Sequence, residues 1–166
     1  MQLVEGDVRD MGAFAAASFD YVFALGGVVS YCSDPAVDIG EMARVLEPGG
    51  ELLADDIHSR CGSMRYAARH GNLDLLEKLA YSTDAALRTP VLLPDELEAL
   101  AHQAGLADAR VWAEFMFEVD NEIRVGPDTE RGERVVLELE MRYCGDARFL
   151  GGGALVLRAV KGGSIE

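Results

Sequence analysis

A histidine that follows two carboxylates is the clearest candidate for proton transfer in this sequence. His58 comes directly after the segment Glu51–Ile57, whose far end carries Asp55 and Asp56. Because imidazole titrates close to neutral pH, His58 is suited to take a proton from a hydroxyl or amine of a bound molecule. A surface histidine without a catalytic role is the alternative that the pattern leaves open.

Glycines at the end of an apolar run mark a second candidate region. Two of them follow the run Phe19–Leu25, and open α/β sheets bind ligands at the carboxyl ends of such strands. We therefore expect Leu25 and Gly26 to border a ligand site, although a double glycine also suits a flexible strand end. Tyr31 and Tyr66 are candidate substrate-binding residues, with plain packing as the alternative.

The cysteines do not suggest a further centre. Cys32, Cys61 and Cys144 are far apart and form no Cys-x-x-Cys pair, so neither a disulfide framework nor a zinc site is indicated. A nucleophilic role for Cys32 or Cys61 lacks an evident base partner. No metal site is expected, and a reducing cytosol fits this cysteine usage best.

Composition favours one globular domain without nucleic acid or membrane partners. The 166 residues are 49% hydrophobic and 27% charged, which is enough apolar material for a core. The formal charge of −14, from 29 acidic and 15 basic residues, would repel a phosphate backbone. The longest apolar run reaches about half the length of a membrane-spanning helix, and no signal-peptide pattern is present. We expect a cytoplasmic protein.

The apolar patterns predict alternating strands and helices. Strands are expected at Gln2–Glu5, Phe19–Leu25 and Glu51–Ile57, and a helix at Pro35–Leu46 joins the last two. Asp34-Pro35 supplies the start of that helix, and Pro48-Gly49-Gly50 supplies its stop. This order predicts a parallel crossover unit. Later elements are a helix around Leu73–Leu79, a helix from Pro94 to Ala104, and strands at Ala109–Phe117 and Gly151–Val160.

Two stretches interrupt this order. Residues 58–90 are interpreted as an insertion or cap and residues 118–150 as a second insertion within the single domain 1–166. Within the second, Val135–Tyr143 alternates polar and apolar residues as a strand does, yet it also consists of good helix formers.

Three short motifs follow one another in the first third of the chain. They are Val-Glu-Gly-Asp-Val-Arg-Asp-Met at residues 4–11, Ser-Phe-Asp-Tyr-Val at 18–22, and Glu-Met-Ala-Arg-Val-Leu-Glu-Pro-Gly-Gly at 41–50. Together they resemble class I S-adenosylmethionine-dependent methyltransferases of the small-molecule type. In that family such motifs end the third strand, form the fourth and lead into the fifth.

The resemblance implies a fold, a reaction and a cofactor site. The fold would be α/β, with a Rossmann-like, mostly parallel sheet, helices on both faces and an antiparallel C-terminal strand pair. The reaction would be methyl transfer from S-adenosylmethionine to a small-molecule acceptor. Gly6, Asp7 and Val8 would hold the cofactor, with the Asp7 carboxylate accepting a hydrogen bond from the adenine amino group. The resemblance also makes Val135–Tyr143 a helix.

The sequence departs from the family in one large respect. The family's opening strand, Gly-x-Gly loop and acidic second strand are not found, so by resemblance the domain is truncated at its N-terminus and its sheet has a gap. We therefore expect a longer natural protein, a re-pairing of Gln2–Glu5 beside Phe19–Leu25, or a second chain, as in a homodimer, that fills the gap.

Two other functions stay open at this level. One is a non-catalytic remnant of the methyltransferase fold that acts as a dimerisation or partner-binding module. The other is a nicotinamide-dependent oxidoreductase, which would need a Gly-x-Gly-x-x-Gly turn that the sequence lacks.

Overall fold

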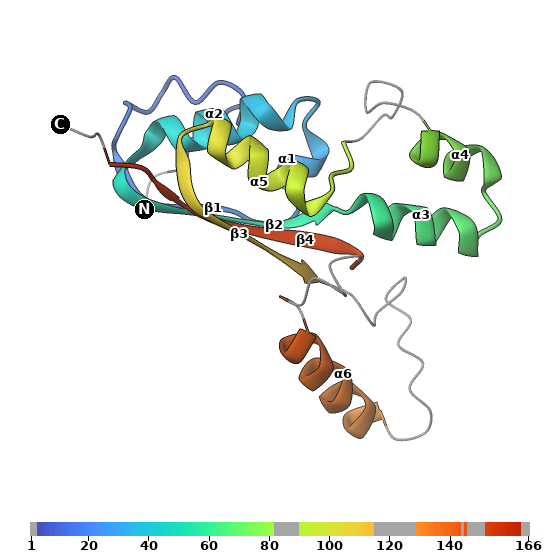
Figure 1. Ribbon diagram of the computed structural model, residues 1–166. Helices are drawn as coiled ribbons and strands as arrows, with labels where there is room; N and C mark the ends of the chain where they lie inside the picture. Colours follow the sequence, from blue (N-terminus) through green and yellow to red (C-terminus); the bar gives the residue numbers. More distant parts are fainter. Residues whose placement is uncertain (1–2, 82–89, 115–128, 144, 146–151, 164–166) are drawn as a thin grey trace.

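The protein is an α/β domain built around one four-stranded sheet (Figure 1). The computed structural model describes residues 3–81, 90–114, 129–143, 145 and 152–163. In chain order its elements are β1 (Phe19–Ala24), α1 (Val28–Tyr31), α2 (Pro35–Val45), β2 (Leu46–His58), α3 (Arg60–Arg69), α4 (Leu73–Tyr81), α5 (Pro94–Gln103), β3 (Leu106–Glu114), α6 (Thr129–Tyr143) and β4 (Ala154–Lys161). The predicted α/β, Rossmann-like fold class is confirmed.

The sheet is mixed rather than mostly parallel. Its order is β1-β2-β4-β3; β1 pairs with β2 in parallel, and β4 runs antiparallel to both β2 and β3. The parallel part is the predicted crossover unit, in which α2 connects β1 to β2. The antiparallel pair at the C-terminal end of the chain, β3 with β4, is also as expected.

Helix α2 begins where the sequence predicts, for the predicted reason. The Asp34 side chain accepts hydrogen bonds from the backbone N–H groups of Ala36 (3.1 Å) and Val37 (3.4 Å), and proline occupies the first helical position. Ile39 and Met42 share the buried face of the helix and pack into the core. This cap and stripe fix the helix against the sheet.

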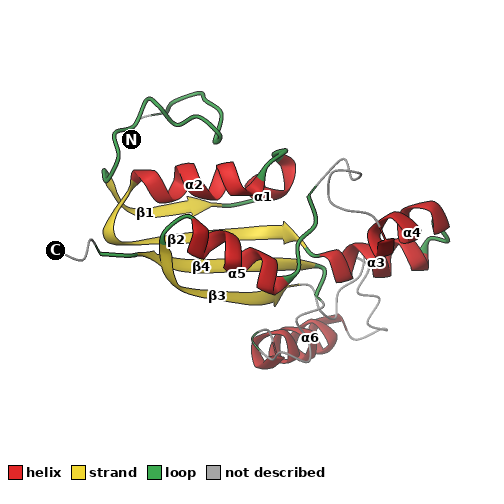
Figure 2. Cartoon of the chain, turned by 45° about the horizontal axis from the view of Figure 1, so that its top comes forward, coloured by secondary structure: helices red, strands yellow, loops and turns green. Residues whose placement is uncertain are grey.

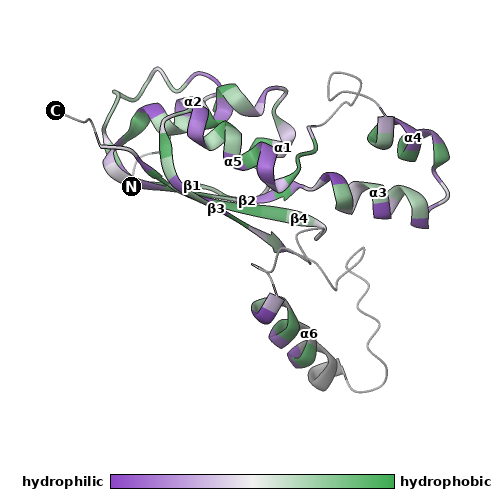
Figure 3. Cartoon of the chain, in the orientation of Figure 1, coloured by the Kyte–Doolittle hydropathy of each residue, from purple (hydrophilic) through white to green (hydrophobic). Residues whose placement is uncertain are grey.

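The helices α1, α2 and α5 cover one face of the sheet (Figures 1 and 2). The covered face carries Leu52 and Ala54 of β2 and Leu155 and Leu157 of β4, all of them buried. Helix α6 lies on the other side of the sheet in Figure 1. It mixes apolar and polar residues along its length (Figure 3), and three of its apolar side chains are exposed: Val135, Leu137 and Met141.

The strand predicted at Gln2–Glu5 is wrong for the residues that the structure describes, Leu3–Glu5, which have no regular structure. A strand needs a neighbour for its N–H and C=O groups, and β1 pairs with β2 only among the described strands. The re-pairing of Gln2–Glu5 beside β1 is therefore not observed.

The N-terminal segment is held instead by an ion pair on α2. Arg44 donates to the carbonyl oxygens of Met11 and Phe14, each at 3.0 Å, and pairs with Glu41 at 2.7 Å. Glu41 in turn accepts a hydrogen bond of 2.9 Å from the backbone N–H of Met11. Val8 and Met11 pack against the main core. These contacts bring residues 5–11 over α2.

The later elements refine the predicted boundaries. Val135–Tyr143 belongs to the helix α6, in line with its helix-forming residues and against its strand-like alternation. Strand β3 begins at Leu106 and β4 at Ala154, so both differ from the predicted ranges by about three residues. Phe117, the predicted end of β3, lies outside the described residues.

Helices α3 and α4 form a hairpin that extends from the end of β2 (Figure 1). It has a small apolar cluster of its own, made by Ala67, Leu79 and Val91. This hairpin lies within the stretch 58–90 that the sequence suggests as an insertion or cap, and that role stays a prediction. Of the second suggested insertion, 118–150, the structure describes mainly α6. None of the described helices has the length and apolar character needed to cross a membrane.

The packing of α3 against β4's leading segment generates a stability prediction. A Cβ atom on Gly62 would lie 2.6 Å from the carbonyl oxygen of Gly153, whereas a Cβ on Gly40 in α2 would meet nothing within 4 Å. Gly62→Ala should therefore lower the free energy of unfolding by about 1–3 kcal/mol. The matched control Gly40→Ala should raise it by about 0.5–1 kcal/mol through helix propensity.

Urea denaturation of both variants measures these changes. Equal effects of the two substitutions would show that the close approach of α3 to Gly153 is not present in solution.

Candidate functional site

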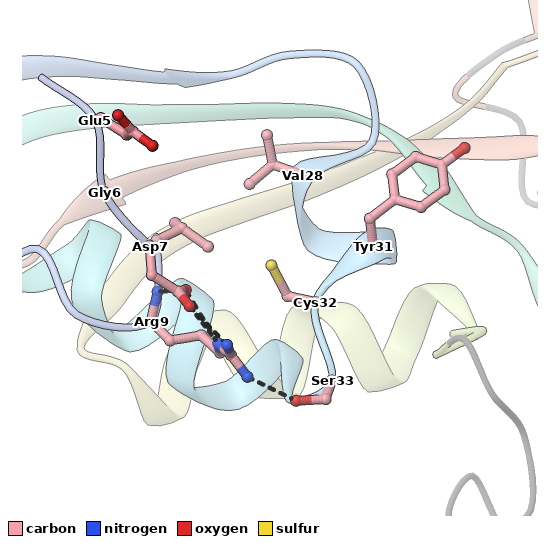
Figure 4. A pocket seen from close by; sticks show the side chains of 9 residues that line it. Glu5, Gly6, Asp7, Arg9, Val28, Tyr31, Cys32 and Ser33 are labelled. Atoms are coloured by element: carbon pink, nitrogen blue, oxygen red, sulfur yellow. Dashed lines mark hydrogen bonds and ion pairs between the residues drawn. The ribbon is translucent and has the colours of Figure 1, made fainter.

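A pocket lies between the N-terminal segment and the chain around α1. Its volume is about 690 Å³, within the usual range of small-molecule sites. One wall is the loop of residues 5–9, and the other is the segment of residues 28–33 (Figure 4). The lining residues are Glu5, Gly6, Asp7, Val8, Arg9, Val28, Tyr31, Cys32 and Ser33.

Asp7 and Arg9 form the strongest polar contact in the pocket. The Arg9 Nη2 atom lies 2.6 Å from Asp7 Oδ2, Nε lies 3.0 Å from Oδ1, and the Arg9 backbone N–H donates to Oδ1 at 2.9 Å. These hydrogen bonds from Arg9 lower the pKa of the Asp7 carboxyl to about 2. Near neutral pH, Asp7 is therefore an ionised group that only accepts hydrogen bonds.

Arg9 also joins the two walls of the pocket. Its Nη1 atom donates to Ser33 Oγ at 3.2 Å, so the guanidinium spans the space between Asp7 and Ser33 (Figure 4). Residues 7–10 form a tight turn, closed by a 3.0 Å hydrogen bond from the Asp10 N–H to the Asp7 carbonyl oxygen. The position of the Asp7 carboxylate thus depends on Arg9, which binds it through its backbone N–H and its guanidinium and is itself held by Ser33.

A buried carboxylate lies behind the second wall. Asp38, in α2, is completely buried, and neither carboxylate oxygen has a hydrogen-bond partner of ordinary geometry among the described residues. Burial is the main reason why the pKa of Asp38 is raised to about 6. The adjacent Cys32 thiol faces the same carboxylate, and burial followed by the charge of Asp38 raises the pKa of Cys32. Cys32 is thus a poor nucleophile here.

The loop after β1 is shaped by two glycines. Gly26 and Gly27 have φ angles of 79° and 78°, which favour glycine over residues with a side chain. A Cβ on Gly27 would lie 2.9 Å from the Tyr31 ring. The Gly26 N–H donates to Asp55 Oδ1 at 2.6 Å, so the ends of the parallel strands β1 and β2 are joined at this edge.

His58 lies at the same edge, at the end of β2. Its backbone N–H donates to Ser30 Oγ at 2.6 Å, and Ser30 Oγ lies 3.3 Å from the carbonyl oxygen of Asp56. The His58 ring packs edge-to-face against Tyr31, with ring centroids 5.4 Å apart. Tyr31 is also one of the residues that line the pocket.

The structure brings some predicted site residues together and separates others. Gly6, Asp7, Val8 and Tyr31 share the pocket. Leu25 and Gly26 do not line it, and the Leu25 side chain is exposed. Tyr66, on α3, is exposed and stacks on His70 at 4.1 Å instead of facing Tyr31. The roles of these residues stay predictions.

Sequence reasoning missed three residues that shape the site, namely Arg9, Ser33 and Asp38. Arg9 stands two positions from Asp7, which is compatible with a local ion pair but does not specify one. Ser33 and Asp38 reach the site only through the fold. Among the described residues, no group of three or more His, Cys, Asp or Glu side chains is placed to hold a metal ion.

Known methyltransferases are similar to this chain in sequence over its first third and in fold. Residues 1–54 match the family model described as a methyltransferase domain. A S-adenosylmethionine-dependent methyltransferase of Thermotoga maritima, described as a possible histamine N-methyltransferase, has a similar fold with a TM-score of 0.58 and 17% identity, over 95% of this chain and 62% of that one. No protein with a curated description matches the chain.

Two further solved structures are similar in fold. The complex of the Haloferax volcanii Trm112 methyltransferase activator with a methyltransferase matches with a TM-score of 0.54 and 21% identity, over 95% of this chain and 60% of that one. Phosphoethanolamine N-methyltransferase 2 of Haemonchus contortus, solved with S-adenosyl-L-methionine, matches with a TM-score of 0.50 and 16% identity, over 90% and 35%.

The resemblance to class I methyltransferases is thereby confirmed, since the family model and the folds agree with the motifs at residues 4–50. The chain spans about 60% of the length of the first two structures, so the activity of the whole protein is a matter of proposal.

Asp38 generates a prediction on pH dependence. Its folded-state pKa of about 6 lies above its ordinary value of 3.8, so the folded protein binds this proton more tightly than the unfolded chain does. This contribution to stability is lost as the pH rises from 3.8 to about 6. Asp38→Asn, which cannot ionise, should therefore raise the free energy of unfolding at about pH 8 by roughly 1–2 kcal/mol, a value discounted for solvent screening.

Urea denaturation at about pH 8 and about pH 5 measures the effect, with Glu138→Gln on the exposed face of α6 as the control. The gain should shrink at the lower pH. A gain that is the same at both pH values would contradict the raised pKa.

Proposed function

We propose that this protein takes part in methyl transfer from S-adenosylmethionine to a small-molecule acceptor, and that the pocket between residues 5–9 and 28–33 receives the adenosine end of the cofactor. The observation that carries the proposal is the Asp7 carboxylate, which lies in a pocket of about 690 Å³ and belongs to the motif at residues 4–11 that resembles the family's adenine-binding segment. The match of residues 1–54 to a methyltransferase domain supports it.

The residues of the pocket fit an adenine ring. The Asp7 carboxylate is an acceptor for the exocyclic amino group, and Val8 continues the same wall. Val28 supplies apolar surface on the facing wall, where a flat ring packs favourably. Arg9 offsets the charge of Asp7, so Glu5 is the carboxylate of the lining that favours a positively charged ligand over an anionic one.

When bound, S-adenosylmethionine supplies a methyl group on a positively charged sulfur, which needs no further activation. The protein then has to align the acceptor and remove its proton. His58 is our candidate for this proton, because its ring packs on Tyr31 at the carboxyl edge of the parallel strands. Tyr31, which contacts the His58 ring and lines the pocket, is the candidate acceptor-binding residue, and Tyr66 on α3 is a second candidate.

Calorimetric titration with S-adenosylmethionine tests the binding step. Asp7→Ala should weaken binding by about tenfold or more, because it removes a hydrogen bond to a charged acceptor. Glu138→Ala, on α6, is the matched control and should bind like the wild type. The absence of heat with the wild-type chain at about millimolar cofactor would contradict the proposal, since such weak binding is close to the limit of specific recognition.

A separate experiment tests the role of His58. With a panel of small hydroxyl and amine acceptors, His58→Ala should slow the release of S-adenosylhomocysteine by about 10²–10⁴-fold, the range typical of a lost general base. Its affinity for S-adenosylmethionine should stay unchanged. A variant that loses cofactor affinity and turnover together would show that His58 has a structural role instead.

A second candidate function is suggested by strand β1. It forms one edge of the described sheet, and Tyr21 and Phe23 on it are 61% and 62% exposed, with their rings stacked at 6.2 Å. An edge strand with exposed aromatic residues is suited to pair with another strand. This arrangement favours the alternative of a module that dimerises or binds a partner.

Light scattering distinguishes the two candidates. A stable dimer that Phe23→Lys converts to a monomer, together with no cofactor binding, would favour the partner-binding module. Cofactor binding that Phe23→Lys leaves unchanged would favour the enzyme.

A further inference from the structure

We propose that Arg9 is a positioning residue that gives the pocket a fixed acceptor and so selects a ligand with a 6-amino purine over one with a 6-oxo purine. This inference rests on the proposed function, because it concerns how the same pocket would recognise the base of its cofactor. It is carried by the hydrogen bonds of Arg9 to Asp7 and Ser33.

The hydrogen bonds around Asp7 restrict which groups of a ligand can bind its carboxylate. A carboxylate offers about four lone-pair positions. Oδ1 accepts from the Arg9 backbone N–H and from Nε, at 2.9 and 3.0 Å, and Oδ2 accepts from Nη2 and from the same Nε, at 2.6 and 3.1 Å. Because the single Nε hydrogen is shared between both oxygens, Nη2 is the one donor that faces Oδ2 alone, and Oδ2 keeps acceptor capacity for one further donor. A ligand that presents an N–H donor satisfies this remaining capacity.

Arg9 also keeps the Asp7 carboxylate in one orientation, in which it can only accept hydrogen bonds. The planar guanidinium matches both carboxylate oxygens, and its other nitrogen is anchored to Ser33 Oγ at 3.2 Å on the opposite wall. Rotation of the Asp7 side chain would break four hydrogen bonds at once. With the carboxylate fixed and ionised, a 6-oxo purine would direct a carbonyl oxygen at another acceptor, which is repulsive.

Lysine would not replace arginine in this role. A single ammonium group on a flexible stem cannot hold both carboxylate oxygens in one plane, and it cannot also reach the opposite wall. The side chains of Asp7 and Arg9 are each 48% exposed, so the contribution to selectivity should be moderate rather than extreme.

The test compares two ligands that differ at one position of the base, S-adenosylhomocysteine and S-inosylhomocysteine. Calorimetry on the wild-type chain should show a preference for the adenine form of about 10–100-fold, the range for a hydrogen bond to a charged group. Arg9→Met should reduce this ratio to about threefold or less, and Arg9→Lys should not restore it. Asp7→Asn should invert it, because the amide can donate to the 6-oxo group.

Two controls separate positioning from folding. Arg134→Met, an exposed arginine on α6, should keep the wild-type ratio. Without ligand, the Asp7 carboxyl ¹³C resonance should titrate at about 2 in the wild type and closer to 3.8 in Arg9→Met. If circular dichroism shows that Arg9→Met is unfolded, Arg9→Lys carries the comparison.

The outcomes distinguish this inference from the proposed function. If the wild type binds S-adenosylhomocysteine and Arg9→Met keeps the full preference for adenine, the role of Arg9 is overturned while the proposed function stands. If the wild type binds neither ligand, the proposed function fails, and the selectivity fails with it.

Discussion

The parallel pairing of β1 with β2 is the constraint on which the rest of the structure depends. It requires a helical crossover, and α2 provides one that begins at Asp34 and packs Ile39 and Met42 on the sheet. Because both strands end at the same edge, the turn at Gly26 meets Asp55, and His58 meets Tyr31. The candidate site lies where it does because of this edge.

The same helix places the other wall of the pocket. Glu41 and Arg44 bind the backbone of Met11 and Phe14, and they thereby hold a segment that has no strand partner. Asp38, on the same helix, is buried against Cys32 without a hydrogen-bond partner of ordinary geometry among the described residues. A buried carboxylate of this kind costs stability at neutral pH, so it is a feature that the rest of the core has to offset.

The sequence predicted those helices and strands that are specified by residues close together in the chain. The Asp34-Pro35 start of α2, the apolar run of β1 and the Pro94 start of α5 are each visible within a few residues of sequence, and all three elements form. The strand expected at Gln2–Glu5 depended on a neighbour that a local pattern does not supply. Val135–Tyr143 combines a strand-like alternation with good helix formers, and the family resemblance decided for the helix that forms.

The site was predictable where a motif named its residues and not where the fold supplied them. Gly6, Asp7 and Val8 came from the motif at residues 4–11, and they do share a pocket with Tyr31. Tyr66 was chosen by residue type, and the fold places it on α3, stacked on His70. Arg9 and Ser33 meet across 24 positions of sequence, a separation over which spacing carries no information about contact.

The central claim is that the Asp7 pocket binds an adenosyl cofactor. It is tested most directly by following the backbone N–H resonances of the chain in a titration with S-adenosylhomocysteine. The account predicts saturable shifts that centre on Gly6, Asp7, Val8 and Tyr31. Saturable shifts that centre instead on the α3–α4 hairpin, or no shifts at all, would contradict it.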